Sequence, residues 1–484
     1  MAGRFLSLFK PVARIIPEIK VPERRVRFNE KLFWTALVLI IFLVMSEVPL
    51  FGIQTSALGE LAALRIIFAS SRGSLMELGI GPIVTAGLIL QLLVGSQIIQ
   101  ANMSDAEDRG LFTSASKVFS IVLTGVQASA YIIGGMYGSL GGTTAVIVFL
   151  QLIAAGIVVL LLDELVQKGW GFGSGISLFI MAGVAQHIFW QAFTPLPGVG
   201  DAAEVHGLSY GFFFALGEVV SRGQPFSDIW LRGQNPSLMG LIATVLAFLV
   251  IIYMEGVRVE LPTSYAGYKG YRSRYPIKLL YVSNLPVIFA SALFANVYFF
   301  SQLFWSTSGQ PRPGANPWLD ILGQFVVNTP TNGGQSTIQP VGGLVYFVTA
   351  PRTFMDVVGD PVRALGYLGI LVAFCVVFSL TWLEVGGLGP STVADQLVDA
   401  GMQIPGYRRS GKAVESILKR YIPAVTVLGG IVVGLIAGVT DFFGVFGSGM
   451  GILLSVGIIY QYYEVLMQER AAEMYPAFRR LFGE

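Results

Sequence analysis

Long apolar runs alternate with short polar connections along the whole chain, and this pattern constrains the fold more than any other feature. A helix needs about 20 mostly apolar residues to cross the hydrocarbon core of a bilayer. The runs of suitable length and hydrophobicity are 32–51, 77–99, 118–137, 144–163, 174–193, 238–254, 282–301, 365–383, 422–440 and 449–466. The sequence therefore predicts an all-α polytopic membrane protein with ten transmembrane helices.

The composition supports lipid as the solvent of this chain. Of its 484 residues, 54% are hydrophobic and 12% are charged, whereas soluble domains carry about 25% charged residues. The lone cysteine, Cys375, excludes an internal disulfide, and two separated histidines, His187 and His206, leave no set of residues suited to a structural metal. We expect no cofactor and no metal.

The distribution of lysine and arginine predicts the orientation of the spans. An even number of spans places both termini on one side, and cytoplasmic segments carry the excess of basic residues. With the N-terminus inside, 24 of the 31 basic residues lie on the inner side. The seven on the outer side are Arg65, Arg72, Arg222, Arg232, Arg312, Arg352 and Arg363. Both termini are therefore predicted to be cytoplasmic.

Two inner segments concentrate the basic residues. They are "EGVRVELPTSYAGYKGYRSRYPIK" and "GYRRSGKAVESILKRYIP", and their basic residues are Arg258, Lys269, Arg272, Arg274, Lys278, Arg408, Arg409, Lys412, Lys419 and Arg420. Such clusters, interleaved with tyrosine, suit the docking of an anionic partner such as RNA. Charge that only fixes topology explains them equally well, so both interpretations stay open.

Residues 5–16 place apolar side chains at helical spacing, which predicts an amphipathic helix within the cytoplasmic segment 1–31. Such a helix lies on the inner membrane surface or packs on a partner helix, and the sequence does not separate the two. On the outer side, long Gly- and Pro-rich loops follow spans five and seven. The stretch "IQPVGGLVYFVTAP" is consistent with a short hairpin or a re-entrant piece.

Neutral polar residues inside the spans are candidates for function, because buried polarity is costly in lipid. Thr85, Gln127 and Asn284 occupy such positions. Each taken alone is better explained as a hydrogen-bonding link between helices. Glycine clusters also begin several spans, as in "GIGPI", "GWGFGSGIS" and "FGSGMGILL". Aliphatic residues follow each cluster, and a ring of these would form a constriction that excludes water.

Strings that imitate catalytic motifs fail on inspection. "GYRRSGKA" approximates a phosphate-binding loop, but Ala413 replaces the hydroxyl residue that would hold magnesium. The zinc-peptidase string H-E-x-x-H is absent. We therefore do not expect an enzyme.

Four segments carry a resemblance to a known family. "LGIGPIVTAGLILQLLVGS", "GFGSGISLFIMAG", "YPIKLLYVSNLPVIF" and "GYRRSGKAVESILKRYIP" are similar, in this order, to signature segments of SecY, the channel-forming alpha subunit of the Sec protein translocase. The similarity runs from the N-terminal helix through the tenth span and is greater to the archaeal and eukaryotic branch than to the bacterial branch.

The resemblance implies a clamshell of two pseudo-symmetric, inverted halves around a pore. The N-terminal half would be 32–193 with a short plug helix at about 55–70, and the C-terminal half 238–466. Inner loops would lie at about 255–281 and 384–421, outer loops at 194–237 and about 302–363, and the cytoplasmic tail at 467–484.

The same resemblance assigns roles to particular residues. The pore ring would be Ile80, Val84, Ile176, Ile180, Ile288 and Leu454. The plug would contain Leu58, Leu61, Leu64, Ile66, Ile67 and Phe68. Thr85, Gln127 and Asn284 would form a polar cluster at a lateral gate between spans two and three and spans seven and eight. The basic inner loops would dock ribosomes.

The function implied is that of a protein-conducting channel that translocates unfolded secretory polypeptides and releases transmembrane helices sideways into lipid. Partners would be small membrane subunits of the SecE (gamma) and Sec-beta types, translating ribosomes, signal sequences, nascent chains and lipid. The membrane would be the plasma membrane, or the endoplasmic reticulum in a eukaryote. The competing hypothesis is a secondary transporter, which should carry charged groups at the midplane; the chain offers mainly Thr, Gln and Asn there.

Overall fold

The structure is a computed structural model. It describes Pro11 and residues 17–24, 26–53, 73–95, 98–99, 106–134, 137, 140–196, 208–233, 235–265, 272–282, 285–309, 316–328, 337–351, 353–403 and 411–474. The predicted plug residues Leu58–Phe68 lie outside this part, as does all of the predicted amphipathic stretch 5–16 except Pro11.

Ten long helices correspond one to one with the ten predicted spans. They are α3 (Phe28–Glu47), α5 (Gly81–Gly95), α6 (Ala106–Ile133), α7 (Gly142–Leu165), α8 (Gly175–Phe193), α12 (Leu238–Gly256), α13 (Leu285–Thr307), α17 (Pro361–Val385), α19 (Gly411–Phe442) and α20 (Gly449–Met474). In the described part of the chain, nine helices are long and apolar enough to cross a membrane, and α5 is a shorter apolar helix of 15 residues. The mostly helical, ten-span prediction is confirmed.

Local sequence explains where several helices begin. Ser237 precedes α12, and its side chain accepts a hydrogen bond from Gly240 N at 3.1 Å. Asp360 precedes α17 and accepts from Arg363 N at 3.1 Å, while Pro361 occupies the first turn. Both arrangements satisfy backbone donors that lack partners within the helix, and proline suits a first turn because no donor is lost there.

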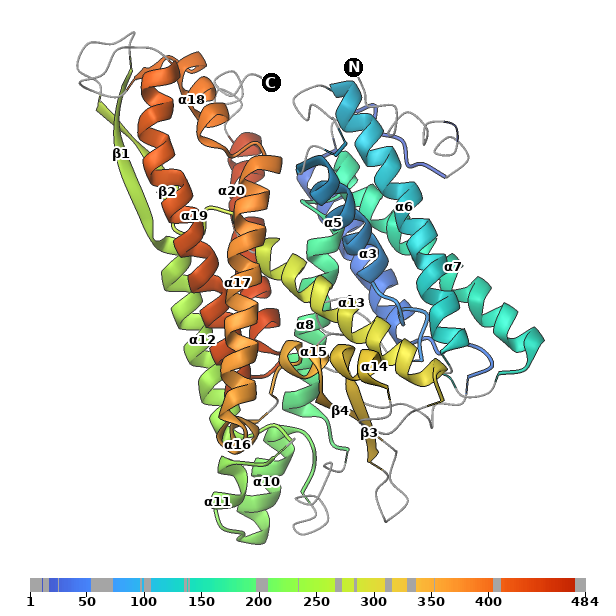
Figure 1. Cartoon of the computed structure of the whole chain (residues 1–484). Helices are drawn as coiled ribbons and strands as arrows, with labels where there is room; N and C mark the ends of the chain where they lie inside the picture. The colour runs from blue at the N-terminus through green and yellow to red at the C-terminus, as the bar shows by residue number, and fades with distance from the viewer. Residues whose placement is uncertain are drawn as a thin grey trace.

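Figure 1 shows α3, α5, α6 and α7 gathered on one side and α12, α17, α19 and α20 on the other, with α13 running obliquely between them. Helix α13 contacts α5 and α6 of the first half and α17 of its own half. Helices α8 and α20 also pack on each other. The two halves therefore meet along α13 and along the α8–α20 contact.

Strands occur at both ends of the bundle, which adds two small sheets to the expected all-α fold. At one end β1 (Arg258–Tyr265) pairs antiparallel with β2 (Arg272–Lys278) and with the short β5 (Met402–Gln403). At the other end β3 (Gln324–Asn328) pairs antiparallel with β4 (Thr337–Gly342). The stretch "IQPVGGLVYFVTAP" thus contains the second strand of a hairpin.

The remaining elements are short. They are the π-helix η1 (Val166–Trp170), α10 (Phe212–Arg222), α11 (Ser227–Trp230), α14 (Pro317–Leu322), α15 (Leu344–Val348), α16 (Phe354–Gly359) and α18 (Pro390–Asp399). Helices α10, α11 and α16 lie at the end opposite β1 and β2 (Figure 1). Arg232 organises the α10–α11 region from a buried position, since its guanidinium donates to Ser209 O at 2.7 Å and Pro236 O at 3.1 Å. Burial lowers the pKa of this guanidinium.

Ion pairs join the end of the last span, α20, to the start of the first span and to the β1–β2 hairpin. All three therefore lie at the same end of the bundle. Lys31, near the start of α3, pairs with Glu469 on α20. Lys278, at the end of β2, pairs with Glu464 at 3.2 Å. An even number of spans requires this arrangement, because the first span must begin where the last one ends.

Candidate functional site

The structure places all six predicted ring residues in one hydrophobic cluster to which helices of both halves contribute. They are Ile80, Val84, Ile176, Ile180, Ile288 and Leu454. Ile80, Ile180 and Leu454 have no exposed surface, whereas Ile176 and Ile288 are partly buried and pack against the cluster. Aliphatic side chains from four separate spans therefore contribute to one apolar cluster, which is the composition that a constriction without specific contacts needs.

The first ring residue sits on the turn that begins α5. Gly79 adopts a left-handed φ of 54°, which glycine tolerates without the cost that a side chain would bring. Ile80 O then accepts hydrogen bonds from Ile83 N at 3.1 Å and Val84 N at 3.0 Å, so the helix grows directly out of the turn. The glycines and proline of "GIGPI" thus let the chain turn sharply into α5.

A polar contact joins the two halves at the predicted lateral gate. Asn296 Nδ2, on α13, donates to Thr85 Oγ1 on α5 at 3.1 Å, and Gln127 Nε2 on α6 donates to Asn296 Oδ1 at 3.5 Å. Asn284, the predicted third member, precedes α13 and lies outside the described residues. The contact partner of Thr85 and Gln127 in the described structure is therefore Asn296, which the sequence analysis missed.

The α6–α13 contact continues toward the end of the bundle that carries β3 and β4. The rings of Tyr131 and Phe299 stack with centroids 4.9 Å apart. Ser306 Oγ donates to Gly134 O at 2.6 Å, and a Cβ on Gly134 would lie 2.6 Å from Leu303 Cδ1. This end of the seam is closely packed because residue 134 has no side chain.

At the other end of the seam, α5, α13 and α17 leave a small hollow. Its lining is Leu88, Gln91, Leu92, Phe289, Phe378, Thr381 and Trp382. The buried Gln91 Oε1 has no hydrogen-bond partner there. The seam is thus packed more loosely at this end than at the Tyr131–Phe299 end.

Backbone hydrogen bonds join the described chain before the segment 54–72 to the chain after it. Leu50 N donates to Gly73 O at 2.7 Å, and Leu75 N donates to Val48 O at 3.0 Å. Ile80 follows five residues after Leu75. The predicted plug residues fall within 54–72, so the described chain on the two sides of the segment that contains them is joined by backbone hydrogen bonds.

Comparison with known proteins finds family matches over most of the chain. The SecY family model matches residues 74–463, and a model of the plug domain of Sec61p matches residues 40–73. The chain belongs to the SecY family.

Solved SecY-family structures are similar over nearly the full length. The solved structure of a protein-conducting channel is 35% identical in sequence to this chain and superimposes with a TM-score of 0.79. The match covers 97% of this chain and 98% of the channel's chain. A SecY structure solved to examine how its plug domain stabilises the closed state shares 35% identity, with a TM-score of 0.77 and the same coverage. Sec61 in the canine ribosome–channel complex from the endoplasmic reticulum shares 35% identity, with a TM-score of 0.76 and the same coverage.

In this SecY-family chain, the two basic segments belong to one structural unit. Leu261 and Ile277 of the β1–β2 hairpin share a hydrophobic cluster with Leu418 and Ile422 of α19. The second segment is not all loop, because α19 begins at Gly411 and extends beyond the apolar part of its span. Both predicted basic surfaces thus have one common support at the end that carries β1 and β2.

Several basic side chains of this unit are exposed. Those described are Arg258, Arg274, Lys412, Lys419 and Arg420. Arg274 pairs with Glu260, which raises the pKa of its guanidinium. Lys419 pairs with Glu415 one turn earlier at 3.0 Å. Lys269, Arg408, Arg409 and the side chain of Arg272 lie outside the described part. The prediction of a docking surface is untested by this geometry.

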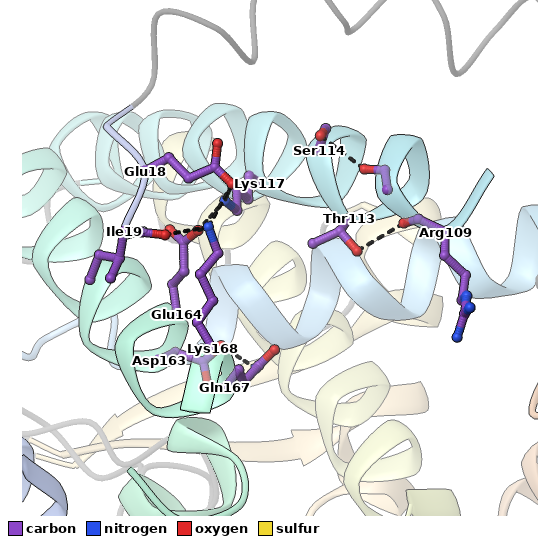
Figure 2. A network of polar contacts seen from close by, with 11 residues as sticks. Glu18, Ile19, Arg109, Thr113, Ser114, Lys117, Asp163, Glu164, Gln167 and Lys168 are labelled. Carbon is purple, nitrogen blue, oxygen red and sulfur yellow. Dashed lines mark hydrogen bonds and ion pairs between the residues drawn. The ribbon is translucent and has the colours of Figure 1, made fainter. Parts of the chain in front are cut away.

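A second polar cluster fixes the segment before α3 to the first half, as Figure 2 shows. Lys168 Nζ on η1 pairs with Glu18 at 2.6 Å and with Glu164 at 2.7 Å, and it also donates to Ile19 O. Lys117 on α6 pairs with Glu164 at 2.6 Å. The hydrogen bond from Lys168 lowers the pKa of Glu18. No sequence motif pointed to this cluster, because its members come from three separate regions.

Proposed function

We infer that this chain is the central pore subunit of a protein-conducting channel, which moves unfolded polypeptides across a membrane and releases transmembrane helices into lipid. The observation that carries this conclusion is the match of the SecY family over 74–463, together with full-length similarity to a protein-conducting channel. The described residues contain no group of three or more potential metal ligands.

We propose that six aliphatic residues form the ring that closes the pore: Ile80, Val84, Ile176, Ile180, Ile288 and Leu454. Four of them are buried in one apolar cluster, and Ile176 and Ile288 pack against it, which supports this assignment. An aliphatic ring fits around an extended polypeptide without selecting its sequence, and it excludes water and ions when no chain is present. The segment containing Leu58–Phe68 would act as the plug; the match of the plug-domain model to residues 40–73 supports this.

The lateral gate would open along the α5–α13 and α6–α13 contacts. Thr85, Gln127 and Asn296 form hydrogen bonds across this seam. Each interhelical hydrogen bond in a membrane contributes about 0.6 to 2 kcal/mol, and each methylene that enters lipid gains about 0.8 kcal/mol. A sufficiently apolar segment of nascent chain can therefore separate the helices, and a polar segment cannot.

Partners and location are proposed from the family. The canine relative was solved in a ribosome–channel complex, which supports docking of a translating ribosome on the basic unit formed by β1, β2 and α19. Small subunits of the SecE and Sec-beta types would support the two halves. The chain is a multi-pass membrane protein; we propose the plasma membrane, or the endoplasmic reticulum in a eukaryote, with both termini cytoplasmic.

Reconstitution distinguishes this function from solute transport. The chain, purified with its small subunits, is placed in liposomes and supplied with ribosomes that synthesise a secretory polypeptide. A channel makes the polypeptide resistant to external protease only when its signal sequence is intact. Protease sensitivity in every condition, combined with saturable uptake of a small solute, would support the transporter instead.

A further inference from the structure

The two halves contain the same four-residue turn at the start of their last span. Phe172–Gly175 precedes and begins α8, and Phe446–Gly449 precedes and begins α20; both read Phe-Gly-Ser-Gly. The first glycine of each has a left-handed φ, 67° at Gly173 and 80° at Gly447. The sequence and the left-handed first glycine therefore repeat 274 residues apart along the chain, whereas the serine that follows differs, with a φ of −119° at Ser174 and 69° at Ser448.

A buried aspartate from the preceding helix binds each turn. Asp163 Oδ1, near the end of α7, accepts from Ile176 N at 2.9 Å. Asp441 Oδ1, near the end of α19, accepts from Gly449 N at 2.6 Å. The first N–H groups of a helix have no acceptor within it, and a carboxylate there is favoured by the helix dipole. Aspartates are rare inside membrane spans, and here one in each half performs the same task.

Each turn is also held by the last span of the other half. Tyr462 Oη on α20 donates toward Phe172 O and Ser174 O, at 3.0 and 2.9 Å. In return, Gln191 Oε1 on α8 accepts from Gly447 N at 2.9 Å. Helices α8 and α20 thus bind each other's first turns reciprocally.

The close contacts at the first glycine of each turn obey the same two-fold relation. A Cβ on Gly173 would lie 2.8 Å from Tyr462 Oη, and a Cβ on Gly447 would lie 2.8 Å from Ile188 Cγ1. Ile188 and Tyr462 are separated by the same 274 residues as the two turns. Both glycines are therefore required for the close approach of α8 and α20.

Ring residues occupy equivalent places in this arrangement. Ile180 and Leu454 are again separated by 274 residues, each one turn or more beyond its glycine turn. We propose that Asp163, Asp441, Gln191 and Tyr462 are positioning residues of the pore ring. Gln191 and Tyr462 bridge α8 and α20, and Asp163 and Asp441 hold the first turns of these two helices, so this side of the constriction stays in place while the α5–α13 side opens. The proposal rests on the ring assignment given above.

Resting ion conductance tests this proposal on the complete channel with its small subunits, in planar bilayers without a translocating chain. Tyr462→Phe removes only the hydroxyl that bridges to the first turn. The matched control is Tyr463→Phe, because the neighbouring Tyr463 is 59% exposed on the same helix. A second pair is Asp441→Ala against Asp441→Asn, since asparagine keeps an oxygen that can accept from Gly449 N. Leu454→Gly serves as a direct test of the ring.

We expect Tyr462→Phe and Asp441→Ala to raise the resting conductance several-fold, while Tyr463→Phe and Asp441→Asn stay close to the unmodified channel. Thermal unfolding of each purified complex is measured alongside, because a purely structural role would lower the melting temperature without raising conductance; that result overturns the proposal. If Leu454→Gly conducts no more than the unmodified channel, the ring assignment itself fails. If Leu454→Gly conducts and Tyr462→Phe does not, only the positioning role fails.

Discussion

Asn296 Nδ2 lies 3.1 Å from Thr85 Oγ1 and donates a hydrogen bond that joins α13 to α5. The same side chain receives a hydrogen bond from Gln127 on α6. One amide therefore contacts both helices of the first half that face the seam. In the lateral gate proposed above these bonds break on opening, which would place Asn296 to set the energy required.

Replacing Asn296 with leucine should lower the hydrophobicity that a nascent segment needs to enter lipid. The change removes two interhelical hydrogen bonds, a loss of about 1–3 kcal/mol at roughly 0.6–1.7 kcal/mol each. Insertion efficiency is measured over a series of test segments that differ in their number of leucines. Thr307→Val is the matched control, since in the part of the chain that the structure describes Thr307 Oγ1 donates within α13, to Leu303 O at 2.7 Å. An unchanged threshold in Asn296→Leu would remove this residue from the gate.

Gly134→Ala should separate α6 from α13 at the closely packed end of the seam. The new Cβ would lie 2.6 Å from Leu303 Cδ1, closer than real contacts allow. Thiol crosslinking between cysteines placed at Tyr131 and Phe299, with Cys375 changed to alanine, measures the separation. We expect a lower yield with a short bifunctional crosslinker. Gly125→Ala on the same helix is the control, because no atom lies within 4 Å of its Cβ position; equal yields for both variants would contradict the account.

Acid should release residues 17–20 from η1. The hydrogen bond from Lys168 lowers the pKa of Glu18 below its ordinary value of 4.5. A lowered pKa means that the contact stabilises fully above pH 4.5 and is lost as the pH falls through the lowered value. A spin label at position 20, introduced as Lys20→Cys in a Cys375→Ala background, reports the change as increased mobility. In Glu18→Gln the label should already be mobile at neutral pH and lack the acid transition; an identical transition in both would exclude Glu18 as its cause.

Reversing the basic residues Arg408 and Arg409 to glutamate should weaken ribosome binding at moderate salt. Binding through contacts to RNA phosphates weakens with salt in proportion to the number of contacts, so the variant should bind more weakly at low and moderate salt, with a shallower salt dependence, and the difference should shrink as salt rises. Cosedimentation with ribosomes over a salt series measures it. Reversal of Arg222, an exposed arginine at the end of α10 on the opposite end of the molecule, is the control. Binding that survives the double reversal would mean that these charges serve only topology.

The sequence was sufficient to predict the spans because lipid imposes a length and a hydrophobicity on each of them. For the proposed gate, the sequence predicted an asparagine in this span but did not give its depth in the membrane. Asn284 and Asn296 both fall in the predicted span 282–301, yet twelve helical residues correspond to about 18 Å along an axis. Only the arrangement of α5, α6 and α13 shows that Asn296 faces Thr85.

Other features depend on contacts between distant segments. Proline at position 262 weakens the strand pattern of β1, whose pairing with β2 is supported by packing against α19. The cluster of Lys117, Glu164, Lys168 and Glu18 has no pattern in the linear sequence. The Phe-Gly-Ser-Gly repeat is visible in the sequence, but its reciprocal contacts with Tyr462 and Gln191 appear only when α8 and α20 are packed.

The most direct test of the central claim is site-specific photocrosslinking of a stalled secretory chain to the proposed ring. A photoreactive residue is placed at Ile80 or at Ile180 in the complete channel, and the control position is Val245, which is 55% exposed on α12. The account predicts crosslinks at both ring positions once the chain is long enough to reach them, and none at Val245. Translocation of the chain without a crosslink at either ring position would contradict it.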